Sequence, residues 1–296
     1  MIHNHDHNYN HNKINMIILI IILLIILTIV FICIKYKFGS ISNCYNEIIY
    51  EQSIKNNNII TKNINRNKKV IPGIHINRIL IVSYDNRSDE KFILEHNKNI
   101  LVYANKYDYT YKFIQNYDSN INTYWKKIFI VRDELQTNNY DYVMWLDTDT
   151  IILNFDIDLN TLINSYNADL YFIDDNIHPK QQINAGVFII KNSSIGNSYI
   201  NDLISSYNNS SFINPYTKKI NGLWGRSCYE QGQMNIILNS NTDYLSKCTV
   251  FPRDIVFCGI DISNCHPNQF IFHFYGTISA NRFQLFNLIN NLLKLN

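Results

Sequence analysis

Short apolar runs alternate with segments of helical periodicity between residues 78 and 146. The apolar runs are Arg78–Ser83, Tyr109–Ile114 and Tyr142–Leu146. The segments between them repeat apolar residues at helical spacing. A strand that is followed by a helix and a second strand predicts a right-handed crossover and a parallel pair. The pattern therefore predicts an α/β fold, with a mostly parallel sheet and flanking helices.

Two helices are expected between these strands. Ser88 fits the N-cap position of the first, with Asp89 and Glu90 in its first turn, and this helix should run to about Asn105. The second helix should span Thr123–Leu135, which is amphipathic.

Length and charge restrict the class of protein. A chain of 296 residues, of which 46% are hydrophobic, can bury one core of roughly 220 residues, so one globular domain is favoured. The formal net charge is only +2, and no basic stripe alternates with aromatic residues. A nucleic-acid partner is therefore not expected.

The first 75 residues differ from the rest of the chain. Residues 16–34 carry no charge, and a helix of this length would rise about 28 Å, enough to cross a bilayer. The stretch is longer than the apolar core of a cleaved signal peptide, about 7–15 residues, so an anchor is expected. We predict a short tail at 1–15, a transmembrane anchor at 16–34, a polar stem at 35–75 and a globular domain at 76–296.

The orientation of this anchor does not follow from charge alone. Lys13 lies on one side of the apolar stretch, and Lys35 and Lys37 lie on the other. By the positive-inside rule this distribution slightly favours a cytosolic C-terminus.

Asp147 and Asp149 directly follow the third apolar run, in the stretch Tyr142–Ile151. Burying unpaired carboxylates is unfavourable, so a pair at a strand end predicts a bound cation or contact with water. Ligands of parallel sheets bind beyond the carboxyl ends of the strands, where these residues lie. A second copy of the pattern, Asp156-Ile157-Asp158, follows no long apolar run and is expected to be a solvated turn or a helix start.

Two chemistries suit Asp-x-Asp at a strand end. In the first, the carboxylates hold Mn²⁺ or Mg²⁺, which bridges the diphosphate of a nucleotide-sugar. In the second, Asp147 attacks a phosphoryl group, as in haloacid-dehalogenase-like phosphatases, whose pattern Thr150 would complete. That hypothesis also finds a later acidic pair, Asp174 and Asp175. The order of motifs argues against it, because such phosphatases usually open with the Asp motif.

Six segments occur in the order and rough spacing of one known family. They are His96–Tyr111, Tyr124–Leu135, Tyr142–Leu153, Ile183–Ser193, Tyr229–Leu238 and Phe270–Gly276. Together they resemble the Golgi galactosyl-, mannosyl- and xylosyltransferases of the galactomannan and xyloglucan type, which are retaining glycosyltransferases of GT-A fold. The resemblance covers about residues 78–280. It implies metal-dependent transfer of a hexose or pentose from a nucleotide-sugar to a glycan or glycoprotein hydroxyl.

The resemblance implies a metal site. Asp147 and Asp149 match the Asp-x-Asp ligands, with Asp149 as the more direct ligand and Asp147 nearer the sugar and ribose. His273 matches the histidine that completes the site from the C-terminal side. It should stand at the end of a strand beside the one that ends at Asp147. Its imidazole should then approach the Asp149 carboxylate within roughly 5 Å.

The resemblance also implies the catalytic groups. Asn184 and Gly186 match the segment that lines the sugar pocket, and Gln231 matches a polar residue near the anomeric carbon. Glu230 is either the acidic group of the site or a cap for the helix that follows it.

The resemblance implies that four further residues lie on the side of the site that binds the nucleotide. Tyr84 and Asp85 should face the base, and Lys127 and Arg132 match basic positions of the preceding helix. The chain departs from the family at Asn105–Tyr107, where "NKY" replaces "HGY". It also lacks a lysine soon after His273, the nearest cation being Arg282. These departures leave open a membrane-tethered glycan-binding protein without activity.

Cysteine content adds one expectation about the compartment. Cys228, Cys248, Cys258 and Cys265 lie in the predicted domain without the paired spacing of a zinc site. They would allow two disulfides in three connectivities, or could be buried thiols. With the anchor, they suit a single-pass type II membrane protein whose domain faces the lumen of the Golgi or another secretory compartment.

Overall fold

The chain divides into two compact units, Met1–Glu47 and Ile48–Asn296. The computed structural model describes residues 76–87, 90–174, 183–209, 213–214, 216–221, 227–251, 255–258, 269–276 and 279–295, all in the second unit. The predicted tail, anchor and stem therefore lie outside the described residues. Among the residues that are described, no helix is both long and apolar enough to cross a membrane.

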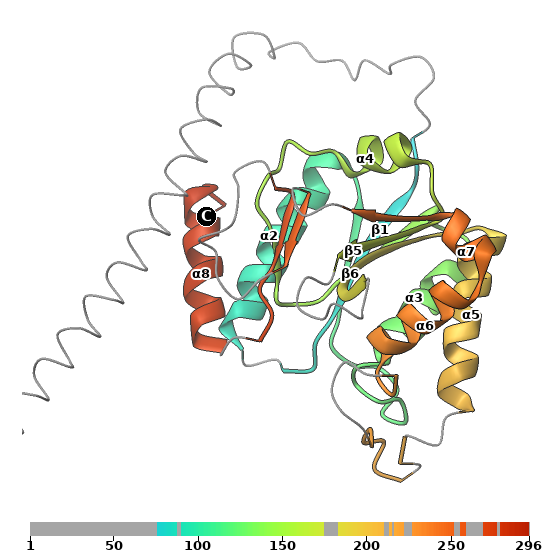
Figure 1. The fold of residues 1–296 in the computed structure, drawn as a ribbon. Helices are drawn as coiled ribbons and strands as arrows, with labels where there is room; N and C mark the ends of the chain where they lie inside the picture. The colour runs from blue at the N-terminus through green and yellow to red at the C-terminus, as the bar shows by residue number, and fades with distance from the viewer. Residues whose placement is uncertain are drawn as a thin grey trace, which may run out of the picture. The chain divides into compact units, whose positions relative to one another are not determined.

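A six-stranded sheet forms the centre of the second unit (Figure 1), with the order β2-β1-β3-β6-β5-β7. Its strands are β1 (Ile79–Tyr84), β2 (Thr110–Ile114), β3 (Tyr142–Leu146), β5 (Leu170–Asp174), β6 (Ile183–Lys191) and β7 (Cys248–Phe251). β1 is parallel to β2 and to β3, as predicted. β6 is antiparallel to both of its neighbours, β3 and β5, so the sheet is mixed.

A smaller sheet has the order β4-β9-β8. Its strands are β4 (Thr150–Ile152), β8 (Val256–Cys258) and β9 (Ile271–His273). β9 is antiparallel to β4, with His273 opposite Thr150. The prediction that the strand of His273 lies beside the strand that ends at Asp147 is therefore wrong. The chain turns after Asp147, where Thr150 N donates to Asp147 O, and enters the second sheet, while β6 lies beside β3.

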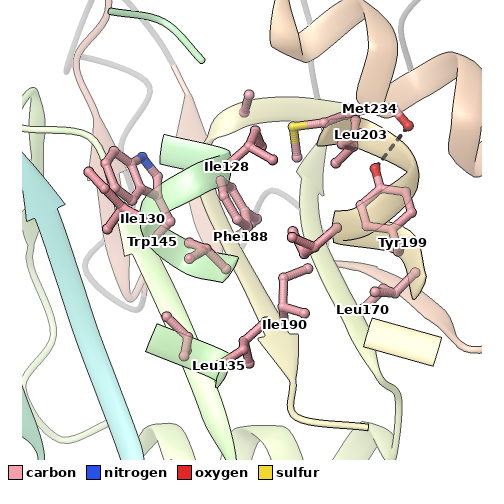
Figure 2. Packing of buried hydrophobic residues seen from close by; sticks show 14 of the residues in the cluster. Ile128, Ile130, Leu135, Trp145, Leu170, Phe188, Ile190, Tyr199, Leu203 and Met234 are labelled. Carbon is pink, nitrogen blue, oxygen red and sulfur yellow. Dashed lines mark hydrogen bonds between the residues drawn. The ribbon is translucent and has the colours of Figure 1, made fainter. Parts of the chain in front are cut away.

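Helices cover both faces of the larger sheet. They are α2 (Lys91–Tyr107), α3 (Lys126–Gln136), α4 (Leu159–Tyr166), α5 (Ser194–Asn208), α6 (Glu230–Ser240), α7 (Thr242–Ser246) and α8 (Ser279–Leu292). Successive strand residues point to opposite faces, so Leu80 and Val82 enter one core while Ile79 and Ile81 enter another. Figure 2 shows the first core, where residues of α3, α5 and α6 pack against β3, β5 and β6. α8 packs against α2.

Helix starts differ from the predictions. α2 begins at Lys91 with Glu90 at the N-cap position, and Ser88 lies outside the described residues. α3 begins at Lys126 rather than Thr123. The preceding residues form a turn, in which Trp125 N donates to the Asn122 carbonyl at 3.0 Å.

The second Asp-x-Asp copy begins a helix, as predicted. Asp158 is the N-cap of α4, and its side chain accepts hydrogen bonds from the backbone N–H groups of Asn160 and Thr161. Asp156 pairs with Lys106 at 2.9 Å. The structural role of this copy explains its carboxylates without a ligand.

The cysteine prediction is answered in part. Cys228 and Cys248 both carry thiols and are not joined to another cysteine. Cys265 and the side chain of Cys258 lie outside the described residues.

Candidate active site

A cavity of about 700 Å³ lies where β1 and β3 end and the two sheets meet. Its lining residues are Tyr84, Asp85, Asn86, Arg87, Thr123, Tyr124, Lys127, Trp145, Asp147, Thr148, Asp149, Asn184, Ala185, Gly186, Glu230, Gln231, His273, Tyr275, Gly276 and Arg282. All the residues that the sequence marked as candidates are in this set except Arg132. The strand ends therefore bring together side chains from seven separate parts of the chain.

Three candidate ligands converge in this cavity. Asp147, Asp149 and His273 each offer one ligand atom, and these atoms lie within 4.8 Å of one another. The His273 Nε2 is 3.2 Å from the Asp149 Oδ1, inside the 5 Å that was expected. Carboxylate oxygens with an imidazole nitrogen are a donor set for divalent first-row ions. The residues present therefore fit a divalent metal ion.

Gly186 allows His273 to reach this position. A Cβ atom at residue 186 would lie 2.1 Å from the His273 Cε1, far inside van der Waals contact. The Gly186 carbonyl accepts from the Asp147 N–H at 2.8 Å, so β6 also fixes the start of the acidic turn. The glycine is needed for close approach, not for an unusual backbone conformation.

The strand that carries Gly186 is irregular at this point. Phe172 of β5 pairs with Phe188, but the next residue, Ile173, pairs with Asn184. Residues 185–187 thus leave the regular pairing with β5 beside the cavity. Such bulges redirect side chains near binding sites.

Amides of α6 and β6 hold this irregular segment. The Asn184 Oδ1 accepts from Gly186 N at 2.7 Å, and the Gln231 Oε1 accepts from Ala185 N at 3.0 Å. Asn235, one turn after Gln231, bonds both backbone groups of Ile183. Asn184 and Gln231 lie on the cavity wall, and their side-chain carbonyl oxygens are already bonded to the backbone of β6. Asn235 was not predicted, although its i+4 spacing from Gln231 placed it on the same helix face.

Lys127 is the buried cation on the β3 side of the cavity. Its Nζ lies 2.9 Å and 3.1 Å from the two Asp147 oxygens, 3.1 Å from the Ala185 carbonyl and 3.3 Å from the Glu230 Oε1. Trp145 Nε1 also donates to Asp147, at 2.7 Å. Burial alone would lower the pKa of Lys127, but the carboxylates of Asp147 and Glu230 outweigh it and raise the pKa above its usual value. Lys127 therefore stays charged.

Glu230 is the first residue of α6 and has one unsatisfied oxygen. Its Oε2 is buried and has no hydrogen-bond partner among the described residues. Burial raises the pKa of Glu230, and Lys127 only partly opposes this. A buried carboxylate oxygen without a partner is unfavourable, so it is a candidate acceptor for a ligand hydroxyl.

Asp149 is held from the other side of the cavity. Arg282 of α8 approaches its Oδ2 at 3.1 Å, and Phe274 N donates to its backbone carbonyl at 2.7 Å. Burial would raise the pKa of Asp149, but His273 and then Arg282 lower it below its usual value. The sequence identified Arg282 only as the nearest cation after His273, and the packing of α8 places it in the site.

Asp85 connects the end of β1 to the acidic turn. It accepts from Arg87 Nη2 and from Thr148 Oγ1, each at 2.6 Å. Burial would raise the pKa of Asp85, but the hydrogen bonds from Arg87 and Thr148 lower it. The Tyr84 hydroxyl accepts from Lys126 Nζ at 3.0 Å. Tyr84 and Asp85 thus line the cavity, and Asp85 also fixes Thr148, the middle residue of Asp-Thr-Asp.

Arg132 does not reach the cavity. It pairs with Asp133 at 2.7 Å and lies over the Phe129 ring. It follows Lys127 by five residues, which turns it about 140° around the helix axis. The structure therefore separates the two basic residues that the sequence grouped together.

The chain matches the model of one protein family over residues 74–275, and that model describes nucleotide-diphospho-sugar transferases. This chain belongs to that family. No curated protein sequence matches it closely enough to serve as a relative. The family match covers the cavity from β1 to the residues just after His273.

One solved structure is similar in fold, and two others match more weakly. A glycosyltransferase involved in glycosylation of the major capsid of PBCV-1 has 13% sequence identity and a TM-score of 0.57, covering 71% of this chain and 99% of that one. The glycosyltransferase GlyE of Streptococcus pneumoniae TIGR4 has 14% identity and a TM-score of 0.43, covering 73% and 63%. The galactosyltransferase LgtC, solved with donor and acceptor sugar analogues, has 13% identity and a TM-score of 0.39, covering 71% and 95%. At this identity the first likeness supports the fold, which is GT-A-like.

Proposed function

We propose that this protein is a metal-dependent glycosyltransferase that moves a hexose or pentose from a UDP- or GDP-linked sugar to a glycan hydroxyl, with retention at the anomeric carbon. One observation carries the proposal. Asp147, Asp149 and His273 converge within 4.8 Å in a chain of the nucleotide-diphospho-sugar transferase family. The resemblance to Golgi galactosyl-, mannosyl- and xylosyltransferases supports retention and the sugar classes.

The proposed metal site uses the acidic turn and β9. Asp149 and His273 would hold Mn²⁺ or Mg²⁺, with Asp147 as a further ligand. When bound, such an ion neutralises the diphosphate leaving group. Lys127 contacts both Asp147 oxygens, so this carboxylate is oriented before any ligand arrives. The nucleotide would lie against Tyr84 and Asp85 at the end of β1.

The sugar would lie between the acidic turn, β6 and the start of α6. Gly186 leaves room for the His273 ring, and the unsatisfied Glu230 Oε2 can accept a hydrogen bond from a sugar hydroxyl. Asn184 and Gln231 hold the backbone of residues 184–186. The acceptor hydroxyl would attack from the face that the diphosphate leaves, while fixed polar groups support the positive charge that develops on the sugar.

We further propose that the protein is a single-pass type II membrane protein of the Golgi or another secretory compartment. The uncharged apolar stretch at residues 16–34 would be the anchor and residues 35–75 the stem. The domain would then face the lumen, where glycan acceptors are found.

The two alternatives have less support. A phosphatase with Asp147 as nucleophile would use the later acidic pair, but Asp174 does not line the cavity, and Asp175 lies outside the described residues. A glycan-binding protein without activity would leave the convergence of three metal ligands unexplained.

A panel of UDP- and GDP-sugars tests the proposal. The purified full-length chain, in detergent, is assayed for Mn²⁺-dependent release of nucleoside diphosphate, with and without glycan acceptors. Asp149→Asn should abolish release. Asp156→Asn, in the second Asp-x-Asp copy on the surface, is the matched control and should not.

Three results would contradict the proposal. Absence of turnover with every donor would favour the glycan-binding alternative. Full activity of folded Asp149→Asn protein would exclude the metal assignment. Hydrolysis of simple phosphomonoesters, with a trapped phospho-Asp147, would favour the phosphatase.

A further inference from the structure

Arg282 contacts the central carboxylate of the proposed metal site. Its Nη2 lies 3.1 Å from the Asp149 Oδ2, while the His273 Nε2 lies 3.2 Å from the other oxygen, Oδ1. Each oxygen of this carboxylate thus has a protein nitrogen at contact distance. An arginine remains protonated throughout the pH range of folded proteins. The protein itself therefore balances the charge of Asp149.

Other contacts fix Arg282 in this place. Its Nε donates to the Phe274 carbonyl at 3.2 Å, and its guanidinium lies 5.4 Å from the centre of the Phe92 ring. The residue is only 9% exposed. Phe274 N in turn donates to the Asp149 carbonyl, so α8, the end of β9 and the acidic turn form one connected unit. The pairing with Asp149 is built into the fold and is not a chance contact of a surface side chain.

A divalent cation and this guanidinium compete for the same carboxylate. An ion bound to Asp149 would share this carboxylate with Arg282, and like charges repel each other. A nucleoside diphosphate reverses this effect. Its oxygens accept bidentate hydrogen bonds from arginine, and its negative charge attracts both cations.

Arg282 also has the donors that such an exchange needs. A guanidinium carries five N–H groups. Among the described residues, its polar contacts are with Asp149 and Phe274. It lines the cavity, so phosphate oxygens can reach it without movement of α8.

We propose that Arg282 is the resident counter-ion of Asp149 and makes metal binding depend on a bound nucleoside diphosphate. Without the diphosphate, Arg282 weakens binding of the ion. With it, Arg282 contacts phosphate and releases the Asp149 Oδ2 to the metal. The coupling rests on the proposed function, because a nucleotide-sugar supplies the diphosphate. It must be reciprocal, so the metal tightens nucleotide binding by the same factor.

Mn²⁺ titrations followed by electron paramagnetic resonance test this directly, using full-length protein with and without UDP or GDP. The nucleoside diphosphate should tighten Mn²⁺ binding to the unmodified protein by about tenfold or more, within the usual range of coupling between sites. Arg282→Gln should bind Mn²⁺ alone about tenfold more tightly than the unmodified protein, and lose most of the nucleotide effect. Arg282→Lys keeps the charge and should bind Mn²⁺ alone as weakly as the unmodified protein. Arg78→Gln removes an exposed arginine that pairs with Asp141 and should change neither quantity.

The outcomes separate the counter-ion from the proposed function. Equal or weaker Mn²⁺ binding by Arg282→Gln with a native circular dichroism spectrum overturns the counter-ion role. If that variant does not fold, the unmodified protein decides, because bound UDP or GDP without effect on Mn²⁺ affinity overturns the coupling. Failure of both nucleotides to bind overturns the donor assignment and the coupling together. The nucleotide-free Mn²⁺ affinity of Arg282→Gln still decides the counter-ion role in that case.

Discussion

Asp147 and Asp149 are two residues apart, yet they belong to opposite walls of the cavity. Asp147 is held from the six-stranded sheet and its helices, by Lys127 of α3 and by the indole of Trp145. Asp149 is held from the smaller sheet and α8, by His273 and Arg282. The chain changes sheets between the two carboxylates.

The two walls differ in how their charges are balanced. The Lys127 Nζ contacts four oxygens from Asp147, Ala185 and Glu230, and its side chain is 8% exposed. Its removal would therefore leave the buried Glu230 carboxylate and the partly buried Asp147 carboxylate without their cation. Among the described residues, the Asp149 carboxylate has one polar side-chain contact per oxygen, each above 3 Å. We infer that the Asp147 wall is fixed structure and that the Asp149 wall exchanges its contacts during binding.

Removing the fixed cation should have the largest effect. Lys127→Met leaves Asp147 and Glu230 without a cation, and breaking a buried pair in this way destabilises a fold by about 3–5 kcal/mol. Urea denaturation at neutral pH measures the change. Adding Glu230→Gln should restore part of the lost stability, because it removes one of the two carboxylates that lack a cation in Lys127→Met.

Lys112→Met is the matched control for this variant. Lys112 pairs with Glu134 at 2.6 Å but is 40% exposed, so the control should lose no more than about 1 kcal/mol. A similar small loss for Lys127→Met would show that Lys127 is not a fixed structural cation of the Asp147 wall.

Removing the exchangeable carboxylate should mainly affect activity. Asp149→Asn removes a proposed direct metal ligand, and the loss of turnover should exceed the roughly 10–100-fold loss typical of outer-shell residues. Asn is preferred to Ala because Asp149 is 18% exposed and contacts the His273 imidazole and the Arg282 guanidinium. Initial rates at several Mn²⁺ concentrations measure the effect. If the folded Asp149→Asn protein kept both the rate and the Mn²⁺ dependence of the unmodified protein, the assignment of Asp149 would be wrong.

Local sequence patterns predicted the first half of the larger sheet. Tyr142–Leu146 is a strand with the predicted bounds, and Arg78–Ser83 is shifted by one residue to Ile79–Tyr84. The acidic turn followed from its place after a buried apolar run. These features depend on neighbours in the chain, so a local pattern is sufficient.

Pairing between distant segments could not be predicted from local sequence patterns. Three features depend on strand registers that short strands do not specify by themselves. They are the antiparallel pairing of β6, the pairing of β9 with β4 and the position of Arg282 beside Asp149. His273 was found only because the order of segments resembles a family. Arg132 is a different case, because helical periodicity alone already placed it away from Lys127.

A methyl group at Gly186 tests whether the close approach of Gly186 and the His273 ring is needed for the site. Gly186→Ala places a Cβ on the His273 ring, so the imidazole must move away from Asp149. We expect a loss of about 1–3 kcal/mol in stability, as for overpacked sites, and weaker Mn²⁺ binding. Gly196→Ala is the matched control, because its Cβ would lie 2.0 Å from the Lys191 carbonyl, outside the cavity. If both variants lost stability and Mn²⁺ affinity equally, His273 would not be a ligand.

The smallest expected effect is a change of the unfolding free energy with pH, caused by Glu230 in the Asp147 wall. Burial raises the pKa of Glu230 above its usual 4.5, so the folded protein holds this proton more tightly than the unfolded chain. As pH rises from 4.5 through the folded pKa, the unfolded state has already lost the proton, and stability falls. Glu230→Gln cannot titrate. The unfolding free energy of this variant minus that of the unmodified protein should therefore rise over the same pH interval and then level off. Urea denaturation at pH steps from 4 to 8 measures the difference. A difference that falls with pH would mean that Lys127 stabilises the Glu230 carboxylate more than burial penalises it. The pKa of Glu230 would then be lowered in the folded protein, contrary to this prediction.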